Sequence, residues 1–568
     1  MSGRALFLIP ARGGSKRIPG KNLRHLAGIP LVAWAGRITS AAATPGDVIV
    51  CSTEDPEIAA VASTWGIRVL SRPSDLATDA ATSLDVAIHA LDTIEREGEP
   101  IDLLVLVQPT SPLTDPADLR AAIDLARETG RSVASVTTSH PAAWHHRLGK
   151  GDSLQPADAE DADRLLTGAF YVTTPDALRR SGRFVEPGVT TGFTTPPEHS
   201  IDIDEPADLR IAAALLGSRE VAPFRLAGRQ VGTPGQGVLV IAEAGVNHDG
   251  DAGIAHRLVD AAADAGADAV KFQTFVPDAL ASAAAPTAAY QRAGDQGEDQ
   301  RAMLQRLVLP TDAWPALQKH AVERGIVFLS TPFDDASADL LDAMDVPGFK
   351  VGSGELTNLP FLERLARRGR PMIVSTGMAT MVEVAAAVDT ISAAGPAELA
   401  LLHCVSSYPA APQDANLAAM RTMREVFGLQ TGWSDHTPGT ELPIAATALG
   451  ATIIEKHLTL DHSRPGPDHA MSLEPSEFAA MVAAIRATAD AIGDGVKVPA
   501  AAEREIAAVA RRSLHWARDL APGETIGEDD LLAQRPGTGI SPARMHELVG
   551  RPTARHVQAG AMVQDGDA

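Results

Sequence analysis

The sequence predicts an α/β protein whose centre is a (β/α)8 barrel, and three observations lead to that prediction. Eight short apolar runs follow one another between residues 238 and 457, with helix-length segments between most of them. The runs are apolar almost throughout, as expected of parallel strands that are buried on both faces. Each run ends near polar residues, and in such a barrel the strand ends meet at one mouth, where active sites lie.

The eight strands and the polar residues at their ends can be stated individually. Strands are expected at Val238–Glu243, Ala269–Gln273, Ile326–Thr331, Gly348–Gly352, Met372–Thr376, Leu399–Cys404, Leu429–Ser434 and Thr452–His457. The polar residues at or just beyond their ends are Glu243, Lys271, Gln273, Ser330, Thr331, Lys350, Ser353, Glu355, Ser375, His403, Ser434, His436, Glu455 and His457. A purely structural barrel would need only apolar and turn residues there, so an active site is predicted at this mouth.

Length and composition narrow the class of protein. A chain of 568 residues is too long for one hydrophobic core, and roughly two to four domains are expected. The two cysteines, Cys51 and Cys404, cannot build a disulfide framework, which favours a reducing cytoplasm. Neither a secretory signal nor a membrane-spanning run is expected from the apolar segments. The net charge of −23 argues against a nucleic-acid partner.

Residues 1–218 are predicted to form an open α/β sheet, which a linker over residues 219–236 joins to the barrel domain at 237–498. Strands are expected at Ala5–Ile9, Asp47–Ser52, Leu103–Val107, Ser132–Val136 and Ala169–Val172, and helices at Pro30–Ala41, Pro56–Trp65, Ser83–Glu97, Pro116–Thr129 and Pro206–Leu216. The linker assignment rests on a polar, Gly/Pro-containing composition without periodicity. A ligand of such a sheet should lie beyond the carboxyl ends of its strands.

A basic, glycine-containing loop over residues 12–22 follows the first strand. Glycines let the backbone approach a polyanion, and Arg12, Lys16, Arg17 and Lys21 supply positive charge. The loop has neither the Walker A spacing nor a dinucleotide fingerprint. It therefore predicts a polyanion site that belongs to neither of these two motif classes. The alternative is a solvated basic loop without a ligand.

Together with Arg72-Pro73, Asp79, the segment 108–113 and the segment 200–204, this loop resembles the acylneuraminate cytidylyltransferases, which join CMP to sialic acids. The resemblance covers most of residues 1–216 and implies a Rossmann-like nucleotidyltransferase sheet. It implies that Arg12, Lys16 and Lys21 hold the CTP phosphates and that Gln108 lies in the sugar pocket. Asn22 is a further substrate-binding candidate, and Lys21 is also the catalytic candidate of this domain.

The same resemblance implies that Asp202 and Asp204 hold Mg²⁺. Two carboxylates one residue apart on a strand point the same way, which suits a hard metal ion. The alternative is an acidic helix entry in which Asp204 caps the last helix of the domain. On the sugar side, Thr114 and residues 167–169 depart from the family pattern, which motivates a second alternative: a non-catalytic binding module.

The barrel carries a second and longer resemblance. Its motifs are Ile241–His248, Val270–Thr274, Ser330–Phe333, Lys350–Glu355, Ser375–Met378, His403-Cys404, Tyr408-Pro409, Ser434–Thr437, Glu455–His457 and Gly466–His469. In order and identity these resemble the sialic acid synthase family, over essentially all of residues 238–568. That family condenses phosphoenolpyruvate with an N-acyl-mannosamine-type sugar, which gives a nonulosonic acid and phosphate.

The residue types suit that reaction. His436 and His457 end adjacent strands, so both imidazoles can reach one ion, and the resemblance implies Mn²⁺ or Mg²⁺. Such an ion would polarise the sugar aldehyde. The predicted phosphate and carboxylate ligands are Lys271, Thr331, Lys350, Ser353, Ser375 and Ser434.

The remaining candidates in the barrel have separate roles. Glu355 is expected to orient or deprotonate the water that attacks C2 of the enolpyruvyl group, and Glu243 to hold sugar hydroxyls and take part in proton transfer. Tyr408 should line the sugar site, and Asp468 is a further substrate-binding candidate. Cys404 is better explained as a small core residue than as a nucleophile, because nothing in the sequence marks it as activated.

Residues 512–568 follow a second linker at 499–511 and change to short strands and turns. Four segments, over residues 513–518, 521–524, 535–540 and 558–560, resemble the antifreeze-like (SAF) domain that ends these synthases. In the family two chains pair head to tail, so a homodimer or higher oligomer with a swapped C-terminal cap is implied. Arg535 then contacts the sugar; the alternative is a surface arginine before a turn.

The sequence therefore predicts a cytoplasmic bifunctional enzyme that makes a sialic-acid-type sugar and activates it with CTP. Its substrates would be phosphoenolpyruvate, an amino sugar and CTP. Two alternatives stay open: an active synthase with a non-catalytic N-terminal module, and a different phosphoenolpyruvate-condensing synthase that uses a phosphorylated sugar. The sequence does not select between N-acetylmannosamine and a 2,4-diacetamido-trideoxy hexose, since one or two side chains could decide this.

Overall fold

The computed structural model describes residues 3–78, 80–138, 164–233, 237–282, 300–395 and 398–568, together with the backbone of 146–148 and 154–156. The chain divides into two compact units, Met1–Ala491 and Ile492–Ala568. Asp79, which was part of the first resemblance, lies outside the described residues. Among the helices described, none combines the length and the apolar character that crossing a membrane would require.

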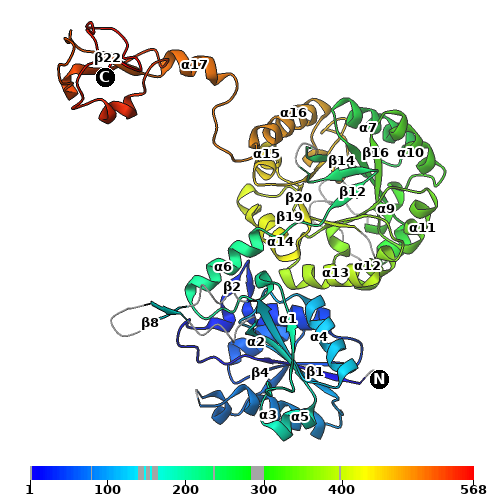
Figure 1. The fold of residues 1–568 in the computed structure, drawn as a ribbon. Helices are drawn as coiled ribbons and strands as arrows, with labels where there is room; N and C mark the ends of the chain where they lie inside the picture. The colour runs from blue at the N-terminus through cyan, green and yellow to red at the C-terminus, as the bar shows by residue number, and fades with distance from the viewer. Residues whose placement is uncertain are drawn as a thin grey trace. The chain divides into compact units, whose positions relative to one another are not determined.

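The N-terminal domain is the predicted open α/β sheet (Figure 1). Its seven strands lie in the order β11-β7-β10-β6-β1-β4-β5. They are β1 (Ala5–Pro10), β4 (Val48–Thr53), β5 (Arg68–Ser71), β6 (Leu103–Val107), β7 (Val133–Thr138), β10 (Arg164–Thr173) and β11 (Thr191–Thr194). All pairs are parallel except those of β10, which is antiparallel to β6 and β7.

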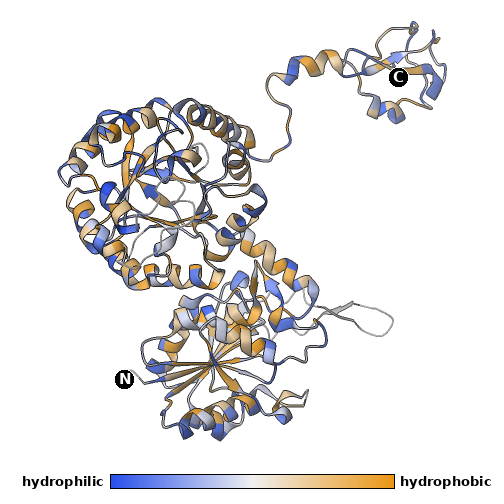
Figure 2. Cartoon of the chain, turned by 180° about the vertical axis from the view of Figure 1, so that it is seen from behind, coloured by the Kyte–Doolittle hydropathy of each residue, from blue (hydrophilic) through white to orange (hydrophobic). Residues whose placement is uncertain are grey.

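Helices cover this sheet, and its central strands are hydrophobic (Figure 2). The helices are α1 (Leu31–Ala42), α2 (Pro56–Thr64), α3 (Ser83–Arg96), α4 (Pro116–Thr129), α5 (Pro175–Ser181) and α6 (Pro206–Gly217). Every predicted strand and helix of this domain is confirmed to within a few residues, apart from a longer β10. The edge strands β5 and β11 were not predicted, because both are short and partly exposed and so lack a continuous apolar run.

The segment around Asp202 and Asp204 differs from the prediction. Residues 200–204 have no regular secondary structure, so the expected strand is wrong. Helix α6 begins after Glu205, and the carboxylate of Asp208 accepts the backbone N–H groups of Asp204 and Glu205 at 2.9 and 2.7 Å. The alternative in which Asp204 caps the helix is therefore also wrong, and its carboxylate makes other contacts.

The centre of the chain is a nearly closed, eight-stranded parallel barrel surrounded by helices, as predicted (Figure 1). The strands are β14 (Leu239–Gly245), β15 (Ala269–Thr274), β16 (Val327–Pro332), β17 (Phe349–Val351), β18 (Met372–Ser375), β19 (Leu399–Cys404), β20 (Gln430–Asp435) and β21 (Ile453–His457). They pair in the order β16-β15-β14-β21-β20-β19-β18-β17, and β17 lies beside β16. The two ends of the sheet are thus brought together.

The surrounding helices alternate with the strands along the chain. They are α7 (Ala252–Asp264), α10 (Ala313–Glu323), α11 (Asp335–Ala343), α12 (Leu359–Ala366), α13 (Met381–Ala394), α14 (Ala418–Phe427), α15 (Glu441–Ala448) and α16 (Pro475–Ile492), with short α8 (Pro277–Leu280) and α9 (Gln300–Arg306) after β15. Alternate strand residues face opposite sides. On β21, Ile454 packs outward in the cluster between strands and helices, whereas Ile453 faces the barrel interior.

A β-hairpin occupies part of the predicted linker at residues 219–236. Its strands are β12 (Phe224–Leu226) and β13 (Arg229–Val231), and its apolar side chains share one buried cluster with interior barrel residues such as Leu239 and Ile453. The hairpin therefore contributes to the barrel core near the strands' amino ends, and the linker assignment is wrong here. The sequence did not reveal the hairpin, because strands of three residues are too short to show alternation.

The C-terminal unit is a small β domain with its own core. Strands β22 (Ser513–Trp516) and β23 (Leu531–Gln534) pair antiparallel around a buried cluster that includes Leu514, Trp516 and Val563. Helix α17 (Glu503–Ala510) lies inside the second predicted linker, 499–511. This agrees with the predicted change to short strands and turns from residue 512.

Candidate active sites in the barrel and the N-terminal domain

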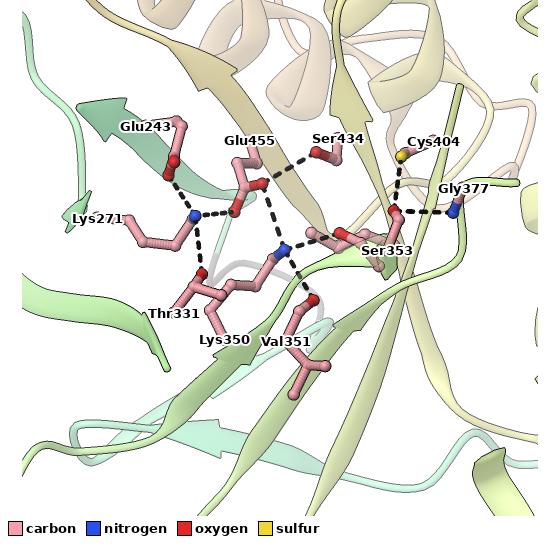
Figure 3. A network of polar contacts seen from close by, with 12 residues as sticks. Glu243, Lys271, Thr331, Lys350, Val351, Ser353, Gly377, Cys404, Ser434 and Glu455 are labelled. Atoms are coloured by element: carbon pink, nitrogen blue, oxygen red, sulfur yellow. Dashed lines mark hydrogen bonds and ion pairs between the residues drawn. The ribbon is translucent and has the colours of Figure 1, made fainter. Parts of the chain in front are cut away.

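Four charged side chains meet inside the barrel at the carboxyl ends of its strands (Figure 3). Lys271 Nζ contacts Glu243 Oε2 and lies 3.9 Å from Glu455 Oε2, and Lys350 Nζ lies 3.4 Å from Glu455 Oε1. All four side chains are at most 6% exposed. Two cations and two carboxylates thus form a balanced cluster that water scarcely reaches, which we call the charge cluster.

Hydroxyl and amide groups surround the charge cluster. Lys271 Nζ donates to Thr331 Oγ1 at 3.1 Å, and Lys350 Nζ donates to Ser375 Oγ at 2.7 Å. Ser434 Oγ donates to Glu455 Oε1 at 2.9 Å, and Gln273 Nε2 donates to Glu243 Oε1 at 3.2 Å. The structure therefore brings together Glu243 and five of the six predicted phosphate and carboxylate ligands: Lys271, Thr331, Lys350, Ser375 and Ser434.

Burial and mutual charge set the protonation of the cluster. Burial raises the pKa of Glu243 to about 7, although Lys271 opposes this. Burial alone would raise the pKa of Glu455, but Lys271, Lys350 and the Ser434 hydrogen bond together lower it. The pKa of Lys271 is raised, since its carboxylate neighbours outweigh burial, whereas burial lowers the pKa of Lys350. Glu243 is therefore the member that can exchange a proton near neutral pH.

Glu455 is the functional candidate to which the sequence assigned no role. Its carboxylate joins the two lysines, so it is the centre of the cluster. The signal was present, because Glu455 lies two residues before His457 on the same strand and hence faces the same side. The pairing register of β20 and β21 places Ser434 opposite Glu455.

The sixth predicted ligand, Ser353, belongs to a second polar group (Figure 3). Its Oγ accepts the backbone N–H of Gly377 at 3.0 Å and lies 3.2 Å from the Sγ of Cys404. Cys404 is buried, and burial raises the pKa of its thiol. A neutral, buried thiol fits the interpretation of Cys404 as a packing residue and not as a nucleophile.

The space around Gly377 is too small for a side chain, so we expect a substitution there to weaken substrate binding. A Cβ there would lie 2.2 Å from Ser406 Oγ and 2.8 Å from Ser353 Oγ, so Gly377→Ala must displace the predicted ligand hydroxyl. We expect the KM for the anionic substrate to rise about 10- to 100-fold, from overpacking of roughly 1–3 kcal/mol. Steady-state kinetics would measure this. Gly354→Ala is the control, because a Cβ at Gly354 meets nothing within 4 Å; equal effects of both changes would contradict a steric cause.

The two predicted metal ligands form an imidazole pair. The rings of His436 and His457 are 5.4 Å apart, and the Tyr408 ring lies 4.4 Å from that of His436. Nδ1 of His436 lies 3.0 Å from the carbonyl oxygen of Val405, which can only accept, so Nδ1 carries the proton and Nε2 keeps its lone pair. Burial lowers the pKa of His436 to about 4 and that of His457 well below its ordinary value.

These properties fit a divalent metal ion. Both imidazoles are neutral at physiological pH, as metal ligands must be, and Nδ1 of His457 is buried without a hydrogen-bond partner among the described residues. Within the described part of the chain, no three His, Cys, Asp or Glu side chains are arranged to hold a metal. The remaining ligands would therefore have to be water and substrate.

Two further barrel candidates, Asp468 and Glu355, have different surroundings. Asp468 is buried, its Oδ2 lies 3.9 Å from His457 Nδ1, and burial raises its pKa to about 6. Glu355 sits in a short 3-10 turn after β17, and its Oε2 accepts a hydrogen bond from Asn358 at 2.8 Å. These contacts place Asp468 beside the imidazole pair and Glu355 in a loop, not in the charge cluster.

The N-terminal domain has a polar cavity of about 300 Å³ next to the basic loop. Its lining includes Arg12, Ser15, Lys21, Asn22, Arg72 and Gln108. Asn22 Nδ2 donates to the carbonyl of Arg12 at 2.9 Å, which fixes the loop against the short turn at Lys21–Leu23. Four predicted ligands therefore meet in one cavity, while Lys16 is exposed and is not part of its lining.

The predicted magnesium ligands are linked to this cavity through Lys21. Lys21 Nζ donates to Asp204 Oδ1 at 3.1 Å, and Arg17 lies 2.9 Å from Asp204 Oδ2. Burial, with a contribution from nearby Asp204, raises the pKa of Asp202. Asp202 therefore has a neighbouring carboxylate, as a site for a hard cation needs, but both oxygens of Asp204 contact cationic side chains of the basic loop in this structure.

Comparisons with known proteins match each part of the chain. Residues 6–165 match a family model described as cytidylyltransferase, residues 258–497 match the NeuB family, and residues 511–568 match the SAF domain. An N,N'-diacetyllegionaminic acid synthase from Legionella pneumophila is 44% identical over 326 residues, which are 56% of this chain and 92% of that protein. The chain belongs to the NeuB family. It is an enzyme in which the synthase barrel follows a cytidylyltransferase domain.

Two further proteins are similar to this NeuB-family chain. An N,N'-diacetyllegionaminic acid synthase from Campylobacter jejuni is 41% identical over 58% of this chain and 99% of that protein. A crystal structure of an N-acetylneuraminic acid synthetase from Leptospira borgpetersenii, in complex with citrate, is 34% identical over 51% of this chain and 96% of that chain, with a TM-score of 0.46.

The SAF domain of this NeuB-family chain contains Arg535. Its Nε donates to the carbonyl of Ala510 at 3.0 Å within the C-terminal unit, and the peptide bond to Pro536 is cis. Its predicted contact with the sugar of a partner chain stays a prediction.

Proposed function

We propose that the barrel condenses phosphoenolpyruvate with an N-acyl-mannosamine-type sugar, and that the N-terminal domain joins the product to CMP. The observation that carries the barrel proposal is the charge cluster beside the imidazole pair in one mouth. Lysines suit an anionic enol donor, and neutral imidazoles suit an ion that activates an aldehyde. The two NeuB-family relatives at 41–44% identity are N,N'-diacetyllegionaminic acid synthases, so we take a 2,4-diacetamido-trideoxy hexose as the first sugar to test.

In this proposal the two lysines hold the phosphate and the carboxylate of phosphoenolpyruvate, with hydroxyls from Thr331, Ser353, Ser375 and Ser434. Lys271 and Lys350 are buried, so their attraction for an anion is stronger than it would be in water. A bound anion would raise the pKa of Glu243 further, and Glu243 would then enter the reaction protonated.

The chemistry follows from these positions. The enol carbon forms a bond to the aldehyde carbon, and the aldehyde oxygen takes a proton, for which Glu243 is the donor. Water adds at C2, where Glu355 orients it and accepts one of its protons. The C2–O bond to the phosphate then breaks, the phosphate leaves with the second proton, and C2 becomes the keto carbon. A Mn²⁺ or Mg²⁺ ion held by His436 and His457 would supply polarisation of the aldehyde. Tyr408 and Asp468, which lie beside the imidazoles, would contact the sugar.

The pH dependence of condensation should report the proton on Glu243. With a pKa of about 7 in the substrate-free chain, its protonated form predominates below neutral pH and is lost above it, so kcat/KM should fall as the pH rises through about 7. The fall in kcat should lie at higher pH, because the bound anion raises this pKa further. Glu243→Gln should lower kcat about 10²- to 10⁴-fold and leave a residual rate that no longer titrates. Glu323→Gln, on the surface of α10, should keep the original profile. A residual rate that still falls near pH 7 would assign the titration to another group.

For the N-terminal domain we propose that Arg12, Lys16 and Lys21 hold the CTP phosphates while Asp202 and Asp204 hold Mg²⁺. Asn22 and Gln108 complete the nucleotide and sugar contacts. The sugar hydroxyl then attacks the α-phosphate, and pyrophosphate leaves. The shared cavity of Arg12, Lys21, Asn22 and Gln108 supports this assignment.

Incubation with CTP, Mg²⁺ and a panel of nonulosonic acids tests the second activity. We expect pyrophosphate release with at least one acid, and loss of that release in Lys21→Met. No pyrophosphate with any acid would favour the alternative of a non-catalytic N-terminal module. The panel for the barrel should include N-acetylmannosamine, the diacetamido hexose and a phosphorylated hexosamine, with products identified by mass spectrometry; a product from the phosphorylated sugar alone would favour the other synthase class.

The oligomer is part of the same proposal. A homodimer or higher oligomer with a swapped SAF cap would bring Arg535 to a partner's sugar site. Light scattering would measure the oligomer. Arg535→Ala should then raise the KM for the sugar far more than the KM for phosphoenolpyruvate.

A further inference from the structure

A buried ion pair lies on β20 and β21, on the strand faces opposite the barrel interior. Asp435 and Lys456 are register partners on these neighbouring strands, and Lys456 Nζ lies 2.6 Å from Asp435 Oδ2. Their side chains are 0% and 1% exposed. By strand alternation they share their faces with Trp433 and Ile454, which pack in the apolar layer between the strands and the helices.

The same pair fixes the turn that carries His436. Asp435 Oδ1 accepts the backbone N–H and the hydroxyl of Thr437 at 3.1 and 2.7 Å, and Lys456 Nζ donates to the carbonyl of Thr437. His436 is thus enclosed between two residues that this network holds. His457 directly follows Lys456, so each member of the ion pair is the chain neighbour of one imidazole.

Stability alone is a poor reason for such a pair. Removing two charges from water is so unfavourable that apolar residues of similar volume often stabilise a fold equally well. Both side chains face away from the mouth, so neither can contact substrate there. The two strands are paired as far as Asp435 and Lys456, and the polar contacts of this pair extend the link between them to Thr437, beyond the end of β20.

We propose that the Asp435–Lys456 pair is a positioning device that holds His436 and His457 at the separation a divalent ion requires. This inference rests on the proposed function of the imidazole pair. The two side chains act through the strand ends and do not themselves bind the ion, as partners outside a metal's own ligands do elsewhere.

Titration of the full chain with Mn²⁺ alone, by calorimetry and without substrates, tests the proposal. The binding that disappears in His457→Ala defines the barrel site and separates it from any binding by the N-terminal domain. We expect Lys456→Met to raise the Kd of that site about 10- to 100-fold, and Lys456→Arg, which keeps the charge, to restore most of the affinity.

Lys456→Met leaves Asp435 as a lone buried charge, so this variant can fail to fold. The double variant Asp435→Asn with Lys456→Met therefore provides the decisive measurement of Mn²⁺ affinity. It has no lone charge, and the amide oxygen that Asp435→Asn introduces can still accept from Thr437. We expect a near-normal thermal midpoint with the same loss of Mn²⁺ affinity. The control is Arg486→Met, which breaks the 2.6 Å pair with Asp268 at the amino ends of the strands and should leave the Kd unchanged.

The outcomes distinguish the positioning role from the ion site. A folded double variant with the unaltered Kd would overturn the positioning role while leaving the ion site intact. Identical Mn²⁺ titrations of the unaltered chain and His457→Ala would overturn the ion site itself, and the positioning role with it.

Discussion

The His457→Ala variant is expected to condense phosphoenolpyruvate with the amino sugar at least about 10³-fold more slowly than the unaltered chain. Loss of the ion that polarises the aldehyde removes several kcal/mol of transition-state stabilisation, and about 4 kcal/mol corresponds to that factor. His436→Ala should have the same effect, because the two rings lie 5.4 Å apart and would hold the same ion. Product formation by mass spectrometry and Mn²⁺ binding by calorimetry would measure the two losses together.

The control for this prediction is His320→Ala. His320 lies on helix α10 in the outer layer of the barrel, where its Nε2 lies 2.9 Å from Asp260 Oδ1 on helix α7. It should leave condensation and metal binding unchanged. Metal-dependent turnover that persists in either His436→Ala or His457→Ala would remove the ion site from the proposal.

The Lys271→Met variant should lose both stability and activity. Without Lys271, Glu243 and Glu455 are left with Lys350 as their only cation in the charge cluster, and breaking a buried ion pair by removing one partner lowers the free energy of unfolding by about 3–5 kcal/mol. Phosphoenolpyruvate should no longer bind measurably, since one of its two cations is missing. Denaturant unfolding and calorimetric titration would measure the two effects.

The pH dependence of that destabilisation has a definite sign. The pKa of Glu243, already raised by burial, should rise further when Lys271 is absent. A carboxyl group whose pKa is higher in the folded than in the unfolded chain lowers stability as the pH rises between those two values. The Lys271→Met variant should therefore lose more stability near pH 8 than near pH 6. Lys319→Met, in an exposed pair with Glu323, is the control and should leave the unfolding midpoint unchanged at both.

Periodicity made the eight barrel strands predictable, and with them the residues that converge. Leu399–Cys404 and Leu103–Val107 were predicted with their observed bounds, because continuous apolar runs of this length are typical of buried strands. The hairpin in the first linker was not predictable, since its strands are too short for a pattern. The conformation around Asp202 and Asp204 was also missed, because the side chain of Asp208 accepts the backbone N–H of Asp204 in place of a strand partner.

Within the site, the sequence identified which side chains reach the mouth, but not how they pair. Glu243 and Lys271 are register partners on β14 and β15, whereas Glu455 reaches both lysines across the barrel interior. Such distances depend on the register and closure of the sheet, to which residues far apart in the chain contribute. For that reason the role of Glu455 and the Asp435–Lys456 contact emerged only from the three-dimensional arrangement.

The amino-acid sequence by itself determined the three-part organisation, the barrel and the chemical character of its mouth, because strand periodicity and residue type are local properties. The tertiary structure alone decided that the two lysines share Glu455, that Lys21 contacts Asp204, and that an ion pair lies behind the imidazoles. Those contacts join residues on different strands or loops, and only packing of the whole sheet brings them within hydrogen-bonding distance.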